Sequence, residues 1–151
     1  MKKDYVIYSL NKAKKTMHQY VDILLKEEGL NDLVSAYSDI LTVLFLHGGK
    51  LKMHEISELV GKDKSTITVL INRLVEKDYV VKEKSPEDKR VYYVSLSDKS
   101  ISNKTAFNGI ADKIRHIAFE GFSEDEQKDF MTYLKRLEDN FINKMNEERG
   151  N

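Results

Sequence analysis

The scarcity of helix-breaking residues is the feature that most constrains this chain. The 151 residues include one proline, Pro86, and seven glycines, so long helices are permitted almost everywhere and each breaker is informative. Apolar residues recur at helical spacing over residues 6–24, which predicts a long first helix ending before Gly29. A second, nearly all-buried helix is expected to have Ser35 as its N-cap and to stop at Gly48 and Gly49.

Two shorter helices are predicted next, on either side of Gly61. The first contains residues 56–60, and Glu55 occupies the position of a capping-box carboxylate, although Lys52 cannot supply the capping oxygen. The second is capped by Asp63 and runs through residues 67–75. Two short helices joined by a tight glycine turn are a candidate helix-turn-helix.

The periodicity changes after Tyr79. Residues 80–84 and 90–96 are rich in β-branched and aromatic side chains, and residues 85–89 between them are typical of a turn, which predicts a β-hairpin with a charged tip. Helical spacing returns from Ser97 onward. A capping box at residues 123–126 then opens a last helix that extends through Met145.

The first and last helices carry apolar stripes that one small helix-turn-helix lobe cannot cover. Each has some twenty residues or more and is therefore about 30 Å long. The simplest arrangement packs the two ends together and against a second copy in a two-fold dimer; a monomer with both ends folded onto one core is the alternative. The expected interface residues are Val6, Leu10, Met17, Phe130, Leu134, Leu137 and Phe141.

Composition excludes several classes of protein. Lys and Arg number 25 and so do Asp and Glu, so no global field attracts nucleic acid or an anionic membrane. The absence of cysteine excludes disulfides, thiolate nucleophiles and cysteine-based zinc sites. The longest apolar stretch, residues 40–46, is far shorter than the roughly 20 residues of a spanning helix, and the first residues lack a secretory signal. We therefore expect a soluble, cytoplasmic protein with no membrane partner.

No catalytic or metal-binding assembly is recognisable. The sequence has no nucleophile elbow and no phosphate-cradling glycine loop. Among the four scattered histidines, only His116 shares a helix face with an acid, Asp112, and two ligands do not make a metal site. An enzyme, a metal and a cofactor are therefore not predicted.

The start of the fourth predicted helix has the chemistry of a DNA-reading surface. Small hydroxyl residues permit close approach to phosphates or base edges, and Asn and Arg can form bidentate contacts with adenine and guanine in the major groove. The alternative is an ordinary surface helix. Residues 62–90 hold eight basic against six acidic side chains, which argues against a strongly non-specific binder. The exposed positions are predicted to be Lys64, Ser65, Thr66, Thr68, Val69, Asn72 and Arg73.

Four segments, residues 53–68, 71–80, 86–90 and 94–97, resemble the MarR family of bacterial and archaeal transcriptional regulators. The resemblance includes an acid two positions before Arg90, which itself lies six residues ahead of a Leu-Ser pair. It implies a mainly α fold with a small β-hairpin wing, in which a winged helix-turn-helix is flanked by N- and C-terminal dimerisation helices. The implied divisions are a dimerisation helix in 1–34, a DNA-binding lobe in 35–97 and further dimerisation helices in 98–151, within one intertwined domain.

The resemblance also implies roles for individual residues. The fourth helix would enter the major groove, and Arg90, paired with and steered by Asp88, would reach the minor groove beside Lys89. Two positions depart from the family pattern: Val69, where relatives often carry a polar residue, could contact a thymine methyl, and Lys62, in place of a usually apolar residue, could touch phosphate.

Many members of this family bind small aromatic or lipophilic effectors between the dimer helices and the DNA-binding lobe. Plain core packing is the alternative for the side chains in that region. Cysteine-based oxidation sensing is excluded for this chain. The implied effector pocket comprises Met17, His18, Val21, Tyr37, Leu41, Phe107 and Ile114.

Taken together, these features predict a sequence-specific regulator of transcription. We expect a homodimeric repressor that binds a pseudo-palindromic operator in double-stranded DNA, with half-sites about one helical turn apart, and that a small effector releases. The alternative is a winged-helix module that binds protein without binding DNA.

Overall fold

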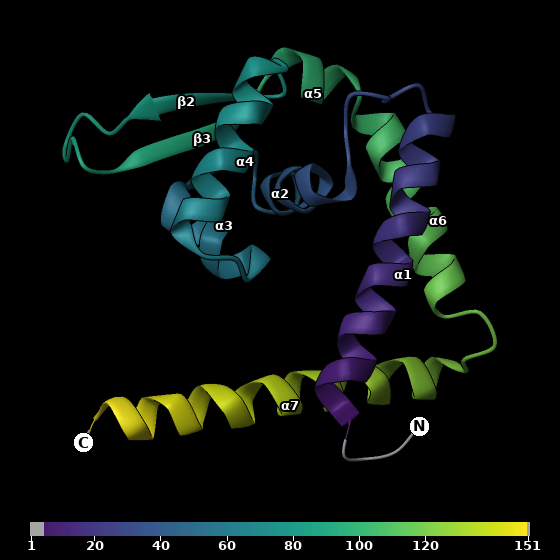
Figure 1. Cartoon of the computed structure of the whole chain (residues 1–151). Coiled ribbons are helices and arrows are strands. Elements are labelled where there is room, and N and C mark those ends of the chain that lie inside the picture. Colours follow the sequence, from purple (N-terminus) through teal and green to yellow (C-terminus); the bar gives the residue numbers. More distant parts are fainter. Residues whose placement is uncertain (1–4, 151) are drawn as a thin grey trace. The chain divides into compact units, whose positions relative to one another are not determined.

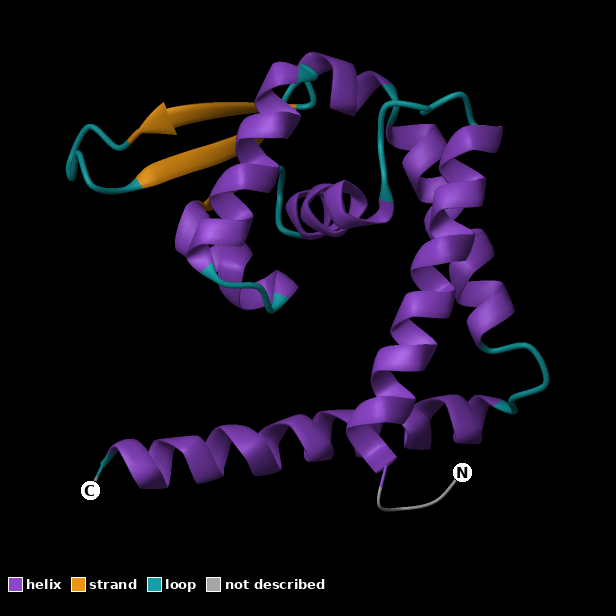
Figure 2. Ribbon diagram, viewed as in Figure 1, coloured by secondary structure: helices purple, strands orange, loops and turns teal. Residues whose placement is uncertain are grey.

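A computed structural model describes residues 5–150 of the chain (Figure 1). The described part is mainly helical with a small antiparallel sheet, as predicted (Figure 2). It divides into two compact units, one ending at Ile114 and one beginning at Arg115. The elements are α1 (Val6–Glu27), α2 (Ser35–Leu46), β1 (Lys50–Lys52), α3 (Met53–Val60), α4 (Lys64–Glu76), β2 (Val80–Lys84), β3 (Tyr92–Leu96), α5 (Asp98–Ser102), α6 (Lys104–Ala118) and α7 (Glu124–Arg149).

The sheet contains a strand that the sequence analysis missed. Its order is β1-β3-β2, with Leu51 of β1 opposite Val94 of β3. With three residues, β1 is too short to show the alternation by which a strand is recognised. The predicted hairpin is confirmed, but its second strand begins at Tyr92 rather than at Arg90, because the amide of Ser85 donates to the carbonyl oxygen of Val91 and closes the turn there.

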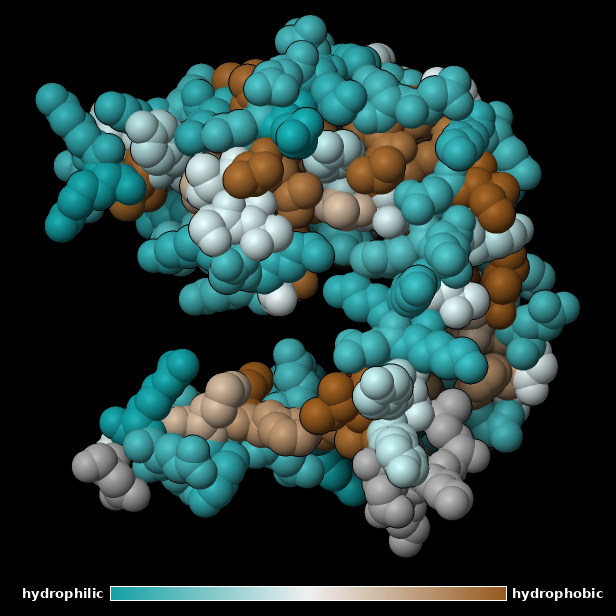
Figure 3. Space-filling model, in the orientation of Figure 1, coloured by the Kyte–Doolittle hydropathy of each residue, from teal (hydrophilic) through white to brown (hydrophobic). Residues whose placement is uncertain are grey.

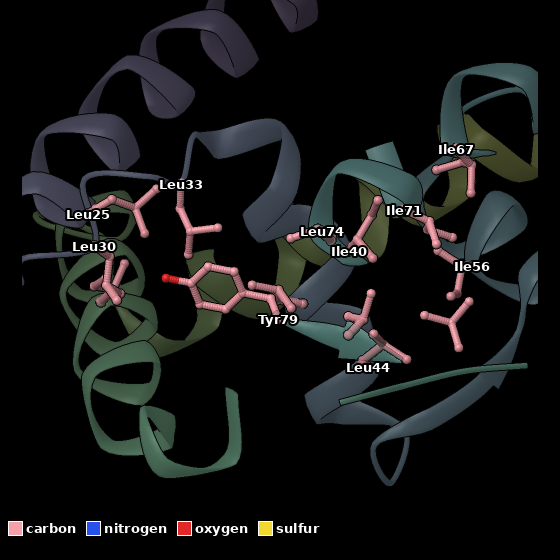
Figure 4. Close-up of a cluster of buried hydrophobic side chains, with 14 of the residues drawn as sticks. Leu25, Leu30, Leu33, Ile40, Leu44, Ile56, Ile67, Ile71, Leu74 and Tyr79 are labelled. Carbon is pink, nitrogen blue, oxygen red and sulfur yellow. The ribbon is translucent and has the colours of Figure 1, made fainter. Parts of the chain in front are cut away.

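Helix α2 is the centre of the hydrophobic core of the first unit. Its side chains Ile40, Leu41 and Leu44 are fully buried, as is Ile56 of α3, and α4 contributes Ile67, Ile71 and Leu74 (Figure 4). Burying one such side chain stabilises the fold by about 1.5–3 kcal/mol. This core supports α3, α4 and the sheet, so it sets the position of the predicted helix-turn-helix relative to the hairpin.

The start of α2 differs from the prediction. Val34 is the N-cap, and Ser35 is the first helical residue. The backbone amide of Ser35 donates to Oδ1 of Asp22 on α1 at 2.6 Å, so a carboxylate from another helix satisfies this free amide. The predicted caps Asp63 of α4 and Ser123 of α7 are confirmed, and the Glu55 carboxylate accepts from the amide of Lys52 at 2.7 Å.

A buried tyrosine connects the lobe to the loop between α1 and α2. Tyr79 follows α4 and is fully buried (Figure 4). Its hydroxyl donates to Oδ1 of Asp32 at 2.8 Å. The Lys99 ammonium lies 3.6 Å from the same carboxylate and 4.1 Å from the Tyr79 ring centroid. Burial alone would raise the pKa of Asp32, but the hydrogen bond from Tyr79 and the charge of Lys99 outweigh it and lower that pKa. Burial and the Asp32 hydrogen bond raise the pKa of Tyr79.

Removing this hydroxyl is expected to weaken the fold in a pH-dependent way. We predict that Tyr79→Phe lowers the free energy of unfolding by about 1 kcal/mol at neutral pH. Because the pKa of Asp32 is lower in the folded chain, the stabilisation is present above the ordinary aspartate pKa of about 3.9 and is lost as the pH falls through the folded-state value. Urea unfolding at pH 7 and at about pH 2, below the lowered pKa of Asp32, measures this. Tyr133→Phe, on the exposed face of α7, is the matched control; equal losses in both variants would contradict the prediction.

The second unit is built around α7. Phe119, Phe122 and Phe130 pack edge to face, with ring centroids 5.8–6.2 Å apart. No α7 side chain is buried in the single chain, and hydrophobic side chains along this helix are exposed to solvent (Figure 3). No helix in the described part of the chain is long and apolar enough to cross a membrane.

Candidate nucleic-acid interface

The turn between α3 and α4 positions the candidate reading helix. Gly61 adopts a left-handed conformation with φ of 72°, which favours glycine and which ends α3. The Ser57 hydroxyl donates to the carbonyl oxygen of Lys62 and holds the turn closed. Asp63 then caps α4 by accepting from the amide of Thr66 at 3.3 Å and from the Ser65 hydroxyl at 2.8 Å. These two hydrogen bonds lower the pKa of Asp63, so the cap is ionised at neutral pH.

The face of α4 away from the core is exposed at the predicted positions except Thr68. Val69 is the apolar member of the predicted set, and 54% of its surface is accessible. Thr68 is half-buried because its hydroxyl lies 2.8 Å from the Lys64 carbonyl oxygen and 3.7 Å from Sδ of Met53. Lys62 is half-buried too. The exposed side chains on this face are Lys64, Ser65, Thr66, Val69, Asn72 and Arg73.

The hairpin tip presents a pre-oriented arginine. The Arg90 guanidinium donates from Nε and Nη2 to the two carboxylate oxygens of Asp88, each at 3.1 Å, and its side chain is 90% exposed. The pairing that the family resemblance implied is therefore present. Hydrogen bonding with Arg90 lowers the pKa of Asp88 and raises that of Arg90, so both groups stay charged. Such a fork restricts where the guanidinium can point.

A buried serine supports this tip. Ser85 is 5% exposed, and its hydroxyl accepts from the amides of Glu87 at 3.3 Å and Asp88 at 3.4 Å. The carboxylate of Asp88 also accepts from the backbone amide of Arg90 at 3.0 Å. The loop that carries Arg90 and the exposed Lys89 is therefore stabilised from within rather than by the sheet alone.

The structure shows how a lobe with so small a surplus of basic residues can present a cationic surface. Of its acids, Asp63 caps α4 and Asp88 holds Arg90. Glu83 lies 3.9 Å from Lys50 of β1. Successive strand residues point to opposite faces, so Glu83 is on the other side of the sheet from Lys82, which faces α4.

A cleft of about 230 Å³ lies between α3, α4 and the hairpin. It brings His54, at the start of α3, together with the predicted residues Lys64 and Arg90. Sequence reasoning missed His54 because its neighbours in the cleft are far away along the chain, and only the packing of α3 against α4 makes it part of this surface. The full lining is Met53, His54, Lys64, Thr68, Arg90, Val91 and Tyr92, which includes no carboxylate.

A second feature that the sequence did not reveal joins the hairpin to α4. Nζ of Lys82 on β2 lies 3.3 Å from Oδ1 of Asn72, and 4.5 Å from the centroid of the Tyr92 ring on β3. Lys84 lies over the same ring at 5.8 Å. The hairpin and α4 are therefore joined by a polar contact as well as by the hydrophobic core.

The other predicted sites lie elsewhere in the structure. Within the effector set, Leu41 is buried in the core and Val21, Tyr37, Phe107 and Ile114 pack against it, whereas His18 pairs with Asp39 at 3.4 Å. Of the dimer set, Leu137 is half-buried in the single chain and the other six, Met17 among them, are exposed. Among the described residues, no three His, Asp or Glu side chains are placed to hold a metal ion.

The fold and this surface define a winged helix-turn-helix protein, in which α4 is the recognition helix and the hairpin is the wing. A sequence profile of the MarR family matches residues 29–91. The uncharacterised HTH-type transcriptional regulator YkoM of Bacillus subtilis is 31% identical over 118 residues, which are 74% of this chain and 70% of YkoM. The chain belongs to the MarR family of transcriptional regulators.

Solved structures agree with this assignment at the level of the fold. A MarR transcriptional regulator from Methanosarcina mazei Go1 superposes with a TM-score of 0.80 at 20% identity, over 93% of this chain and 99% of that one. MepR from Staphylococcus aureus, solved as a complex with DNA, superposes with a TM-score of 0.76 at 20% identity, over 89% and 96%. The recognition helix and wing are therefore set in the architecture that MepR also has.

Proposed function

We propose that this MarR-family protein is a sequence-specific DNA-binding repressor. The observation that carries the proposal is the exposed Arg90 guanidinium, held by Asp88 at the wing tip. An oriented cation of this kind suits a narrow, negatively charged minor groove. The exposed face of α4 offers polar side chains that can hydrogen-bond to base edges. It also offers Val69, which can contact a thymine methyl. The DNA complex of MepR, a protein of the same fold, supports this assignment.

The same proposal includes a homodimer. α1 and α7 expose apolar side chains that a single chain leaves in water, among them Phe141 with 55% of its surface accessible. Pairing these helices with those of a second copy would remove that surface from water. A two-fold dimer carries two recognition helices, so it requires a pseudo-palindromic operator with half-sites about one helical turn apart. Occupying such an operator excludes the polymerase.

A small effector that loosens the complex completes the proposal. The side chains first assigned to it are mostly core, but a cleft of about 240 Å³ lies close by, between α1, α2 and α3. Lys14 and Asp39 at this cleft supply polar groups beside the apolar Val43 and Leu59. That mixed lining of apolar and polar groups suits a small aromatic or lipophilic effector.

Selection of binding sites from a random pool of duplex DNA tests the DNA-binding function. We expect an inverted repeat to be enriched, and the affinity for it to fall steeply as salt rises, because phosphate contacts release counterions. Pull-down of a protein partner with salt-insensitive affinity, and no enriched DNA at low ionic strength, would favour the protein-binding alternative. Lys144→Ala, on α7 of the second unit, is the control for a general loss of positive charge.

A further inference from the structure

The contact between Lys82 and Asn72 constrains which atoms of Asn72 can face DNA. A lysine ammonium has three donors and no acceptor. The Asn72 atom 3.3 Å from Nζ of Lys82 must therefore be the amide oxygen, Oδ1. The amide nitrogen is the other end of the same planar group. The hydrogen bond from Lys82 therefore distinguishes the amide oxygen from the amide nitrogen and fixes the orientation of the amide.

Lys82 is itself held in place. Its ammonium lies over the Tyr92 ring, 4.5 Å from the centroid, which is within the range of a favourable cation–π contact. Lys82 is half-buried, whereas Asn72 is exposed on the face of α4 that carries Val69. The amide oxygen is thus turned toward the wing, and the NH₂ group is the part of Asn72 free to turn toward a base.

We propose that Asn72 is a specificity-determining residue that selects a keto base, guanine or thymine, through its amide NH₂, and that Lys82 is the positioning residue that imposes this choice. The inference rests on the proposed DNA-binding function. Guanine offers two adjacent acceptors, N7 and O6, and thymine offers O4. Adenine offers only N7, beside the N6 NH₂ donor that an amide NH₂ would face, and cytosine presents only an NH₂ donor. A bidentate contact with adenine needs the amide oxygen of Asn72 to face the N6 amino group of the base, whereas the hydrogen bond from Lys82 holds that oxygen toward the wing.

Three variants test this with operators selected from random duplex DNA. Asn72→Ala identifies the base position that Asn72 reads, as the position where preference disappears. At that position we expect the wild-type protein to prefer guanine or thymine. Lys82→Met keeps the aliphatic stem but removes the donor, so the amide is free to turn and the preference should shift toward adenine by roughly fivefold to tenfold. Asn72→Asp presents only acceptors and should favour adenine or cytosine at the same position.

Lys84→Met is the matched control. Lys84 lies over the same Tyr92 ring at 5.8 Å and on the same face of β2 as Lys82, but two residues nearer the hairpin tip. It should weaken binding to all sequences equally and leave the base preference unchanged. Wild-type selection of adenine at the Asn72 position, or an identical base preference in wild type and Lys82→Met, would overturn this inference alone. A wild-type protein that selects no sequence would overturn the proposed function, and this inference with it.

Discussion

Replacing Leu137 by glutamate is expected to convert the protein from a dimer to a monomer. Leu137 lies on α7 at helical spacing from Phe130, Leu134 and Phe141, and this stripe is the proposed partner-facing surface. A carboxylate there would be buried without a counter-charge, which costs about 3–5 kcal/mol, and two-fold symmetry places one in each copy. Sedimentation equilibrium measures the change in mass.

The same substitution should remove high-affinity binding to a full operator, because a monomer reads one half-site. Thr132→Glu is the matched control, since Thr132 is an exposed α7 residue about 140° around the helix from Leu137. We expect it to remain dimeric and to bind as the wild type does. A Leu137→Glu protein that still sediments as a dimer would contradict the proposed interface, while loss of the dimer in both variants would show that added negative charge alone is responsible.

Arg90→Ala is expected to weaken operator binding by about 1–3 kcal/mol and to leave the dimer intact. The guanidinium is on the wing and outside the hydrophobic core, so its loss should remove the proposed DNA contact without a packing defect. Each phosphate or groove charge removed should also reduce the slope of log affinity against log salt by about one. Gel-shift titrations at several salt concentrations measure both quantities.

Two neighbouring variants make the Arg90 experiment specific. Lys89→Ala removes an exposed cation from the same tip that has no carboxylate fork to orient it, and should have a smaller effect. Asp88→Asn keeps Arg90 but loosens its orientation, so its effect should lie between those of the other two. An Arg90→Ala protein with unchanged affinity would contradict the role of the wing arginine.

Local patterns predicted most of the elements. Asp63 and Ser123 are followed by helices at the expected residues because a capping side chain acts within one turn of its own helix. The hairpin was visible because β-branched and aromatic residues change the periodicity after Tyr79. By contrast, the start of α2 was misplaced by one residue, since the group that satisfies its first amide, Asp22, belongs to another helix.

The candidate site was predictable to a similar depth. The exposed face of α4 followed from helical spacing, and the Asp88–Arg90 pair was implied by the resemblance to the MarR family. The position of His54 in the cleft could not be predicted, because nothing in its own segment distinguishes it from a solvent-exposed histidine. The packing of α3 beside the wing brings it next to Lys64 and Arg90.

The amino-acid sequence alone specified the order of the helices, the hairpin and the polar face of α4, since periodicity, caps and turns act between residues a few positions apart. Tertiary packing determined how the Asn72 amide is oriented on that face of α4. Lys82 is ten residues from Asn72 and on a different element, and it meets the amide oxygen only because the sheet docks beside α4. Contacts of this kind depend on how elements fit together, and no local pattern encodes that fit.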